Sequence, residues 1–443
     1  MSRCPSKQKF KSRAATASGY VVRGGWLAWI GVFLAVLAQV FPVVMGRLAN
    51  DELADGAWLM PLVVWSLFAV LACWWSRPTV FAGDRGFVFL TVLLLGLGVG
   101  EQLRLRTWAE SWTDWRAYAP LIVGCLGFLF MLRVLTTVRV EMLLRRLAWG
   151  FWIAALGTLG ILFFFGRSYR GGLFLPGQIN PSELVKLGLV AFGAVWISER
   201  VKPLSRTVMG VPCPPFGVCI AFVLVWGLPL FGGLIVRDLG LVLILCLTVM
   251  LMLTAATRRF GWFLFGIIAA GIAGWAIQFI STHTRQRFSV WLDPFQDPTG
   301  SGWQIGQSLC AQFAGGLWGT GIGEGTPGAV PIVTNDFVYA AVAEEWGLVG
   351  CVVLLSVCWL WIAKLSRMGD VLDSSICHLF GTGVAALMGV QIVLNVGGVT
   401  KALPMTGITF PFLSQGGFSL LTVLLACGLA AALGNPGVSS RRA

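Results

Sequence analysis

Apolar runs, most of them long enough to cross a bilayer, constrain this chain more than any other feature. Hydrophobic residues make up 57% of the sequence and charged residues only 12%, whereas soluble domains carry roughly 25% charged residues. A membrane β-barrel would show short alternating segments instead of long runs. We therefore predict an all-α polytopic membrane protein with about twelve spans, at 25–45, 57–75, 86–100, 117–135, 147–166, 182–198, 214–232, 238–256, 260–279, 337–363, 376–396 and 411–433.

The charges between these runs predict their orientation. Lys and Arg gather in alternate loops, which are cytoplasmic by the positive-inside rule. This pattern predicts a multi-pass protein with both termini in the cytoplasm, and it explains the net charge of +13 without nucleic acid, since the basic residues form no single patch. The run at 25–45 is too long for a signal peptide and lacks a clear cleavage site. Residues 1–24 and 437–443 are then predicted cytoplasmic tails.

The sequence offers no motif for a resident cofactor. The cysteines are scattered, mostly within apolar runs, and the two histidines lie far apart. They lack the spacing of a zinc site. We also find no phosphate-binding loop and no dinucleotide fingerprint, so we predict no metal site.

The loop at about 280–336 is the one long stretch without an apolar run. Its aromatic residues, glycines and prolines predict a folded loop, and the charge pattern places it outside the cell. Because ATP is absent there, any chemistry must use an already activated substrate. Asp293 and Asp297, in DPFQDP, are predicted either to cap turns or to supply a general base. Arg287 is a candidate phosphate ligand.

Polar residues at span ends near this loop complete the candidate site. In NPSE, Asn180, Pro181 and Glu183 predict a capping box, and Glu183 shares one helix face with Lys186. Asp238 opens a later span. Each is also explained by helix capping or interfacial anchoring. The broken run 395–421 is predicted either as a structural re-entrant loop or as a wall of the site. The other candidates are Gln304, Gln307 and Ser308, on a short helix that lines a cleft, and Asp336 and Glu345, at the start of a span.

Four stretches in order make the chain resemble the SEDS family (shape, elongation, division and sporulation), the FtsW, RodA and SpoVE type. They are INPSELVKL, RDLG, the run from RFSVWLDPFQDPTG to NDFVYAAVAEEWGLVG, and LPMTGITFPFLSQGG. The resemblance implies a core of about ten helices over 81–436, preceded by about two extra membrane helices at 25–80. It also implies a location in the bacterial cytoplasmic membrane.

The resemblance implies site residues one by one. Asp297 matches the family's essential loop aspartate and is the predicted catalytic base. The predicted substrate-binding residues are Arg287, Glu183, Lys186, Arg170, Asp238, Gln304, Gln307, Ser308, Asp336 and Glu345. This sequence departs from the family pattern at Asn180, Ile332, Thr334, Gln415 and Phe418, which leaves the fine substrate contacts and the partner in doubt.

The activity that the resemblance implies is a peptidoglycan glycosyltransferase that polymerises lipid II on the outer face of the membrane, for division, elongation or sporulation. A class B penicillin-binding protein is the implied partner. The resemblance leaves room for a divalent cation, Mg²⁺ or Mn²⁺, at the substrate diphosphate. Two alternatives remain: a flippase for a lipid-linked precursor, and a non-catalytic scaffold of a cell-wall synthase.

Overall fold

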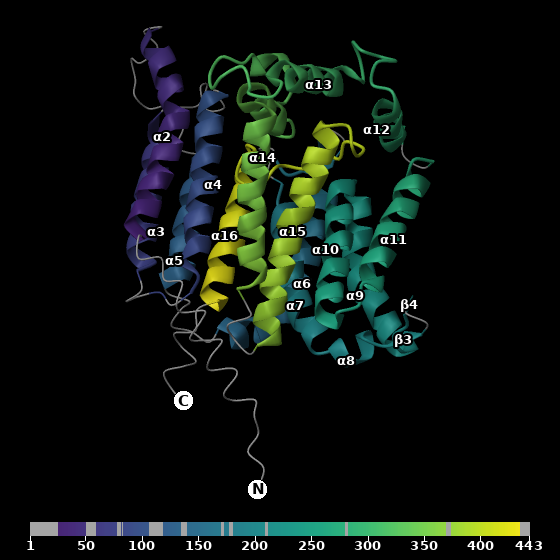
Figure 1. Cartoon of the computed structure of the whole chain (residues 1–443). Helices are drawn as coiled ribbons and strands as arrows, with labels where there is room; N and C mark the ends of the chain where they lie inside the picture. The colour runs from purple at the N-terminus through teal and green to yellow at the C-terminus, as the bar shows by residue number, and fades with distance from the viewer. Residues whose placement is uncertain are drawn as a thin grey trace.

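The computed structural model describes residues 25–49, 59–77, 81, 83–105, 118–133, 140–169, 172–176, 180–208, 211–279, 282–368 and 374–434. Long helices stand side by side over this part of the chain (Figure 1). Each predicted apolar run coincides with one of them. Their bounds are α2 Gly25–Ala49, α3 Met60–Trp75, α4 Arg85–Arg104, α5 Ala119–Arg133, α6 Val140–Phe165, α7 Ser182–Ser198, α9 Phe216–Ile235, α10 Leu239–Thr257, α11 Gly261–Ile277, α14 Val338–Ser366, α15 Ser375–Val399 and α16 Gly417–Leu433.

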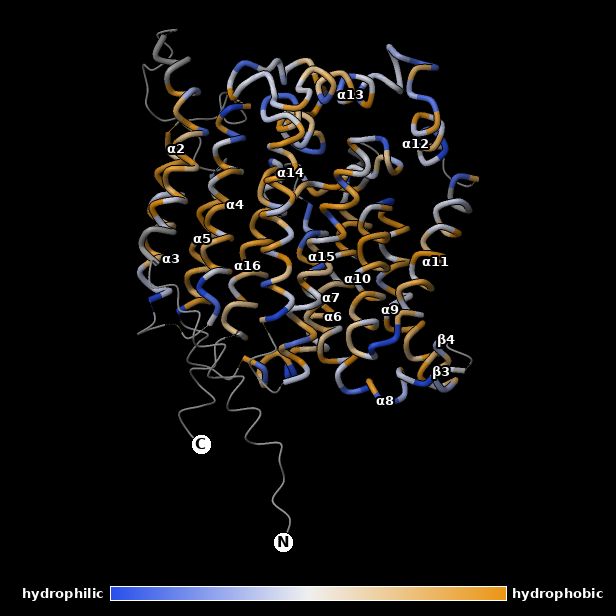
Figure 2. Tube along the Cα trace, viewed as in Figure 1, coloured by the Kyte–Doolittle hydropathy of each residue, from blue (hydrophilic) through white to orange (hydrophobic). Residues whose placement is uncertain are grey.

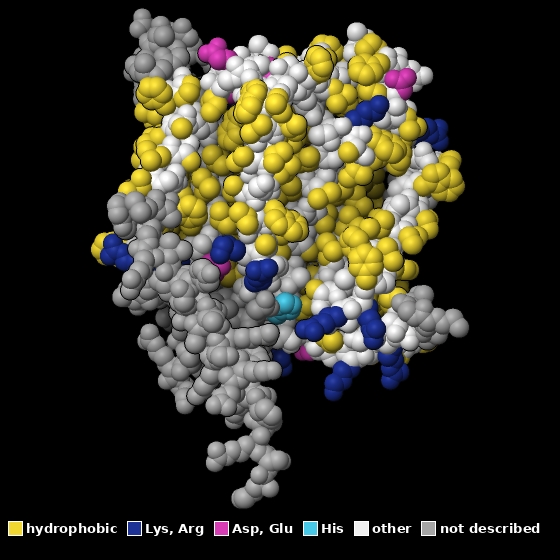
Figure 3. Space-filling model, viewed as in Figure 1, with side chains coloured by type: hydrophobic (Ala, Val, Ile, Leu, Met, Phe, Trp, Pro, Cys, Tyr) yellow, Lys and Arg dark blue, Asp and Glu magenta, His cyan; other side chains and the backbone are white. Residues whose placement is uncertain are grey.

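The predicted fold class is confirmed. Six helices, α4, α6, α9, α10, α14 and α15, are long and apolar enough to cross a membrane. Apolar residues follow the helix shafts, and hydrophilic residues gather at the ends of the bundle (Figure 2). Large hydrophobic side chains cover the flank seen in Figure 3, with Lys and Arg concentrated toward its lower end. An apolar flank between polar ends is what a bilayer requires of a spanning bundle.

The two ends of the bundle differ. One end, here called the loop end, carries α12 (Thr282–Leu292), α13 (Trp303–Gly315) and the short turn η4 (Pro327–Ala329). The opposite end carries α8 (Val201–Leu204) and the strands β3 (Thr207–Val208) and β4 (Val211–Pro212), which pair antiparallel. Strands β1 (Arg167–Tyr169) and β2 (Gly172–Phe174) form a second antiparallel ribbon, between α6 and α7. The sequence predicted only one short helix in the 280–336 loop, which corresponds to α13, and the structure adds a second helix, α12.

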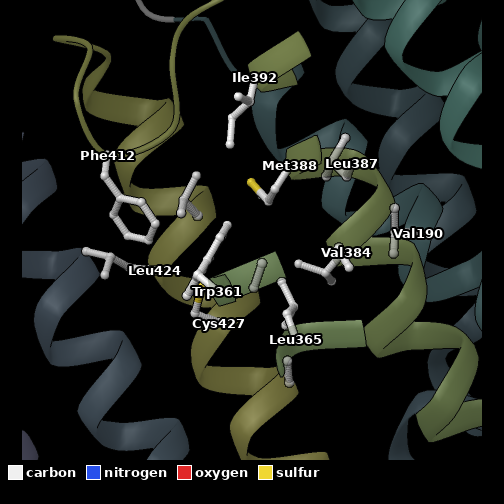
Figure 4. Close-up of a cluster of buried hydrophobic side chains, with 14 of the residues drawn as sticks. Val190, Trp361, Leu365, Val384, Leu387, Met388, Ile392, Phe412, Leu424 and Cys427 are labelled. Carbon is white, nitrogen blue, oxygen red and sulfur yellow. The ribbon is translucent and has the colours of Figure 1, made fainter. Parts of the chain in front are cut away.

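Buried packing fixes the irregular segment before α16. Trp361 of α14 is fully buried, donates from Nε1 to Thr91 Oγ1 at 3.0 Å, and packs edge-on against Phe412 with ring centroids 5.2 Å apart. Figure 4 shows these side chains among others from α15 and α16. A Cβ at Gly98 of α4 would collide with the Phe412 carbonyl. Glycine at 98 therefore lets this non-helical backbone pass close to α4.

Helix α14 is broken near the loop end. Gly347 has φ 65° and ψ −172°, outside the helical region. Beyond the break, the Leu348 and Val349 amides donate to the carbonyls of Gly316 and Leu317 at 3.0 and 3.1 Å. The chain after α13 thus replaces the hydrogen bonds that the helix loses, as buried backbone requires.

The two helices that precede the core pack directly on α4. Trp65 of α3 donates from Nε1 to the Val92 carbonyl at 3.0 Å. A Cβ at Gly96 of α4 would lie 2.5 Å from Val36 of α2 and 2.7 Å from Trp65. This position of α4 therefore requires glycine. The two extra helices predicted before the core are thus α2 and α3, and they contact α4 closely at a glycine.

Candidate active site

A cavity of about 1340 Å³ lies at the loop end, between the helix starts and the long loop. Such a volume exceeds the usual range of drug-sized pockets, roughly 300–1,000 Å³, and suits a larger ligand. Segments far apart in sequence build its lining: the starts of α5, α7, α10 and α16, parts of α12 and α13, and the irregular stretches near 299–301, 331–336 and 405–409. The broken segment predicted as either structural or functional therefore forms part of the cavity wall.

The start of α7 brings Glu183 and Lys186 into the lining. Glu183 Oε2 lies 2.7 Å from Lys186 Nζ, and the Lys186 side chain is 5% exposed. The predicted capping box is therefore wrong, because the Glu183 carboxylate turns to the buried ammonium group and not back to the helix start. Asn180 Oδ1 accepts from the Ser182 amide at 3.0 Å, and the helix begins at Ser182.

Asp238 joins two helix starts at the cavity. Its carboxylate caps α10 by accepting from the Leu241 amide at 2.9 Å, and it also accepts from Ser182 Oγ of α7 at 3.2 Å. The preceding Arg237 is exposed with φ 61°, a left-handed conformation, and lines the cavity beside it. Asp238 therefore anchors the start of α10, one of the two roles predicted from the sequence, and it also lines the cavity.

Arg287 of α12 approaches the cavity from the loop. Burial lowers the pKa of its guanidinium, while the negative charges of Asp336 and Asp238 oppose that shift. A Cβ at Gly407 would lie 3.5 Å from Asp336 Oδ2 and 3.6 Å from Arg287 Nη2, so both side chains reach the same part of the wall. Gln304, from the first turn of α13, also lines the cavity. Together they present fixed charges and donors suited to a polar, anionic substrate group.

Asp297 is exposed and lies two residues before the cavity-lining stretch 299–301. It accepts from the Ser301 amide at 2.7 Å, from Ser301 Oγ at 3.0 Å and from the Gly300 amide at 3.1 Å. Bonds from Ser301 are the main cause of a pKa below the ordinary aspartate value, so the carboxylate is ionised at neutral pH. Thr299, Gly300 and Ser301 line the cavity, whereas Asp297 itself is not among the lining residues.

Asp293 has a simpler role. It accepts from the Phe295 amide at 3.0 Å, a local turn bond. Both loop aspartates therefore cap turns, as one of the two sequence interpretations predicted. Catalysis by Asp297 stays a prediction.

Several predicted substrate ligands lie away from the cavity lining. Ser308 is fully buried and donates to the Val399 carbonyl at 3.1 Å, and Gln307 also lies outside the lining. The Glu345 carboxylate lies 2.5 Å from Arg104 Nη2 and accepts from the Gly323 amide at 3.0 Å, so it fastens the loop. Arg170 lies outside the described residues. Substrate binding by these four remains a prediction without a contact to support it.

Two buried amides that the sequence analysis did not single out hold the cavity wall. Gln102 Nε2 of α4 donates to the carbonyls of Leu413 at 2.5 Å and Thr334 at 3.1 Å. Asn395 Nδ2 of α15 donates to the carbonyls of Ile408 at 2.6 Å and Asp336 at 2.9 Å. For Asn395, an amide inside an apolar run is the signal that would have found it, because a buried amide needs partners. Gln102 lies just beyond the run predicted at 86–100, next to Glu101, so its sequence carries no such signal.

The positions that depart from the family pattern cluster at this wall. Asn180, Ile332, Gln415 and Phe418 line the cavity, and Thr334 accepts from Gln102 and from the Gln415 amide through its carbonyl. Among the described residues, no group of three or more His, Cys, Asp and Glu side chains is arranged to hold a metal ion.

Comparison with known proteins gives a consistent match. The family model described as cell cycle protein, of the FtsW/RodA/SpoVE type, matches residues 86–435. Stage V sporulation protein E of Bacillus subtilis is 31% identical over 378 residues, covering 83% of this chain and 91% of the relative. The peptidoglycan glycosyltransferase RodA of Mycobacterium tuberculosis is 36% identical over 258 residues, 57% of this chain and 55% of the relative. The match thus spans about half the length of the mycobacterial relative.

Solved structures share the fold. A chain of a peptidoglycan synthase complex that coordinates polymerization and crosslinking superposes with a TM-score of 0.62 at 27% identity, covering 80% of this chain and 98% of the other. The rod shape determining protein RodA of Thermus thermophilus superposes with a TM-score of 0.56 at 24% identity, over 80% and 97% of the two chains. The family model begins at residue 86, after α2 and α3, so these two helices precede the part of the chain that it matches.

Proposed function

Because the chain belongs to the FtsW/RodA/SpoVE family of cell cycle proteins, we propose that it is a peptidoglycan glycosyltransferase that polymerises lipid II into glycan strands. It is an integral membrane protein of the bacterial cytoplasmic membrane. The loop end faces outward in this proposal and both termini face the cytoplasm. Arg200 and Lys202 belong to the α8 region, and Arg258 and Arg259 to the turn between α10 and α11, at the opposite end of the bundle (Figure 1).

The observation that carries the proposal is a single cavity that unites residues from all four family-like stretches. Lys186, Asp238 and Arg287 line it with Asp336, and the segment 405–409 closes one side. Cations and carboxylates on one wall suit a substrate that has both a diphosphate and sugar hydroxyl groups. Lipid II has both, and its diphosphate leaving group makes it an activated donor, so the reaction needs no cytosolic energy source.

The proposed reaction is a substitution at the donor's anomeric carbon. A hydroxyl group of the acceptor sugar attacks this carbon and forms the new glycosidic bond. The bond between the carbon and the diphosphate oxygen breaks, and the lipid diphosphate leaves. Asp297 takes the proton of the acceptor hydroxyl, which requires its carboxylate to exchange a Ser301 bond for the substrate. A base in this role contributes about 10²–10⁴-fold.

The other residues bind and orient in this proposal. Arg287 and Lys186 hold the diphosphate. Glu183 keeps Lys186 in place, Asp238 and Asp336 balance the charge of Arg287, and the two aspartates also accept from sugar hydroxyl groups. Gln304 faces the sugar from α13. A class B penicillin-binding protein is the proposed partner, which cross-links the strands. The similarity to a chain from a peptidoglycan synthase complex supports this part of the proposal.

A flippase is the main rival function. It would need polar groups along a path across the whole bilayer. Among the described residues, the fully buried charged side chains Glu101, Lys186, Glu344 and Glu345 all belong to the loop-end segments of α4, α7 and α14. This one-sided distribution favours chemistry at one face over transport. A scaffold without activity is the second rival, and it would not need a charged cavity.

The test is polymerisation of purified lipid II by the full chain in liposomes, with and without a class B penicillin-binding protein. The products are resolved by length and digested with a muramidase to prove that they are glycan strands. The same liposomes are assayed for movement of fluorescent lipid II between leaflets. Polymer without lipid movement supports the proposal. Lipid movement without polymer would establish the flippase, and neither activity under any partner condition would favour the scaffold.

A further inference from the structure

We propose that the helix pair α2–α3, which precedes the family-like core, positions the cavity wall and the long loop through Gln39. The effect on polymerisation rests on the proposed function, whereas the effect on loop order does not. Gln39 is thereby a positioning residue: it acts through α4 and touches none of the residues assigned to the substrate.

Gln39 makes polar contacts from α2 to α4. It is 3% exposed, and its Nε2 donates to the Leu97 carbonyl at 3.1 Å and to Glu101 Oε2 at 3.2 Å. Gly100 makes room for it, because a Cβ there would lie 2.7 Å from Gln39 Oε1. Glu101 is itself 2% exposed. An amide donor to a buried carboxyl group is a contact whose loss is costly.

Glu101 belongs to the end of α4 that fastens the long loop. Arg104, one turn later, lies 2.5 Å from Glu345 Oε1 and donates to the carbonyls of Gly323 and Gly325 at 3.2 and 3.0 Å. These bonds secure the loop at 323–325, between the cavity-lining stretches 299–305 and 331–336 and nearer to the second. Helix α2 also approaches this loop directly, since a Cβ at Gly323 would lie 3.7 Å from Pro42.

The same end of α4 also contacts the cavity wall, through Gln102, the residue after Glu101. Gln102 donates to the Leu413 and Thr334 carbonyls, and the Thr334 carbonyl also accepts from the Gln415 amide at 2.7 Å. Gln415 and Asn335, the neighbour of Thr334, line the cavity. The path from α2 to the lining is therefore Gln39 to the end of α4 and from there to the wall, a contiguous set of short contacts.

These contacts make a physical prediction for Gln39. Without its amide, the buried Glu101 carboxyl group loses its donor, and the end of α4 must shift or admit water to satisfy it. Any such shift moves Gln102 and Arg104 together, because both follow Glu101 within one helical turn. The extra helices thus set the geometry of the wall and the loop without entering the cavity.

The test compares wild type with Gln39→Leu, Gln39→Glu and the exchanged pair Gln39→Glu with Glu101→Gln. Hydrogen exchange of the peptide that spans 318–328 reports loop order, and kcat and KM for lipid II report the reaction. Leu37→Ala, at an exposed position of α2, is the control. Thermal unfolding of each variant separates loss of the fold from loss of positioning.

Both single variants should exchange roughly tenfold faster in 318–328, the equivalent of one net hydrogen bond. Their kcat should fall several-fold, although each variant still folds and unfolds in a cooperative transition. The exchanged pair restores a donor and an acceptor, so it should recover both values. Wild-type exchange and kcat in Gln39→Leu would overturn the proposal, as would failure of the exchanged pair to recover either value in a folded protein. If wild type makes no polymer, the proposed function fails, and the exchange measurement alone still decides whether Gln39 positions the loop.

Discussion

Lys186 Nζ lies 2.7 Å from Glu183 Oε2, in the first turns of α7 and in the lining of a cavity. The lysine side chain is 5% exposed and the glutamate side chain 16%. An ammonium group in such a place needs either its carboxylate or an anionic ligand. In the proposed function, Lys186 is therefore a buried cation, neutralised by Glu183, that can also bind a substrate diphosphate.

Replacing Lys186 separates these two roles. We expect Lys186→Met to lower lipid II polymerisation at least 100-fold and to destabilise the protein by about 1–3 kcal/mol, less than for a fully buried pair because the cavity admits water. The double variant Lys186→Met with Glu183→Gln removes both charges and should recover stability without activity. Thermal unfolding and polymer assays measure the two effects. Full activity in either variant would contradict a role for Lys186 in binding the diphosphate.

The break in α14 predicts an unusually sensitive glycine. Gly347→Ala places a Cβ at φ 65° and against the backbone of Gly319. We expect a loss of about 2–4 kcal/mol, combining the left-handed conformation with the collision. Gly271→Ala in α11 is the matched control, because a Cβ there meets nothing within 4 Å. Equal thermal midpoints for the two variants would show that the break is not needed.

The pKa of Asp297 predicts how activity depends on pH. Ser301 holds this pKa below the ordinary 3.8, so the carboxylate is ionised throughout pH 5–8 and its protonation adds no acid limb there. Any stability that the Ser301 bonds supply is present above the ordinary pKa and is lost only as the pH falls through the lowered value. Ser301→Ala should raise the pKa toward 3.8 and still leave the carboxylate ionised.

The measurement for this prediction is kcat/KM from pH 5 to 8 in wild type and Ser301→Ala. The pH profiles of the two proteins should have the same shape between pH 5 and 8. An acid limb in wild type that moves to higher pH in Ser301→Ala would assign it to Asp297 and refute the prediction.

Much of the fold was predictable because a bilayer imposes a length on apolar runs. The run predicted at 182–198 has the same limits as α7, and most other spans differ from their helices by a few residues. The cavity residues Glu183, Asp238, Arg287 and Asp336 were predicted from polar residues at span ends and from family-like motifs. The break in α14 and the pairing of Glu345 with Arg104 were not predicted, because contacts between residues distant in sequence determine them.

Two examples show why local pattern was insufficient. The stretch around Gly347 is predicted as one continuous helix, since the bonds that stabilise its break come from Gly316 and Leu317, far away in sequence. Glu345 is an acidic residue at the start of a span, which made it a candidate substrate ligand. Its carboxylate instead pairs with Arg104 of α4 and holds the loop. Neither partner is visible from the local sequence.

The most direct test of the central claim is the length of glycan made from purified lipid II by wild type, Asp297→Asn and Asp293→Asn. Asparagine at 297 can still accept from the turn, but it takes no proton. We expect polymer from wild type and from Asp293→Asn, and a loss of about 10²–10⁴-fold in Asp297→Asn with an unchanged thermal midpoint. Equal polymer from Asp297→Asn and wild type would contradict the assignment of Asp297 as the base.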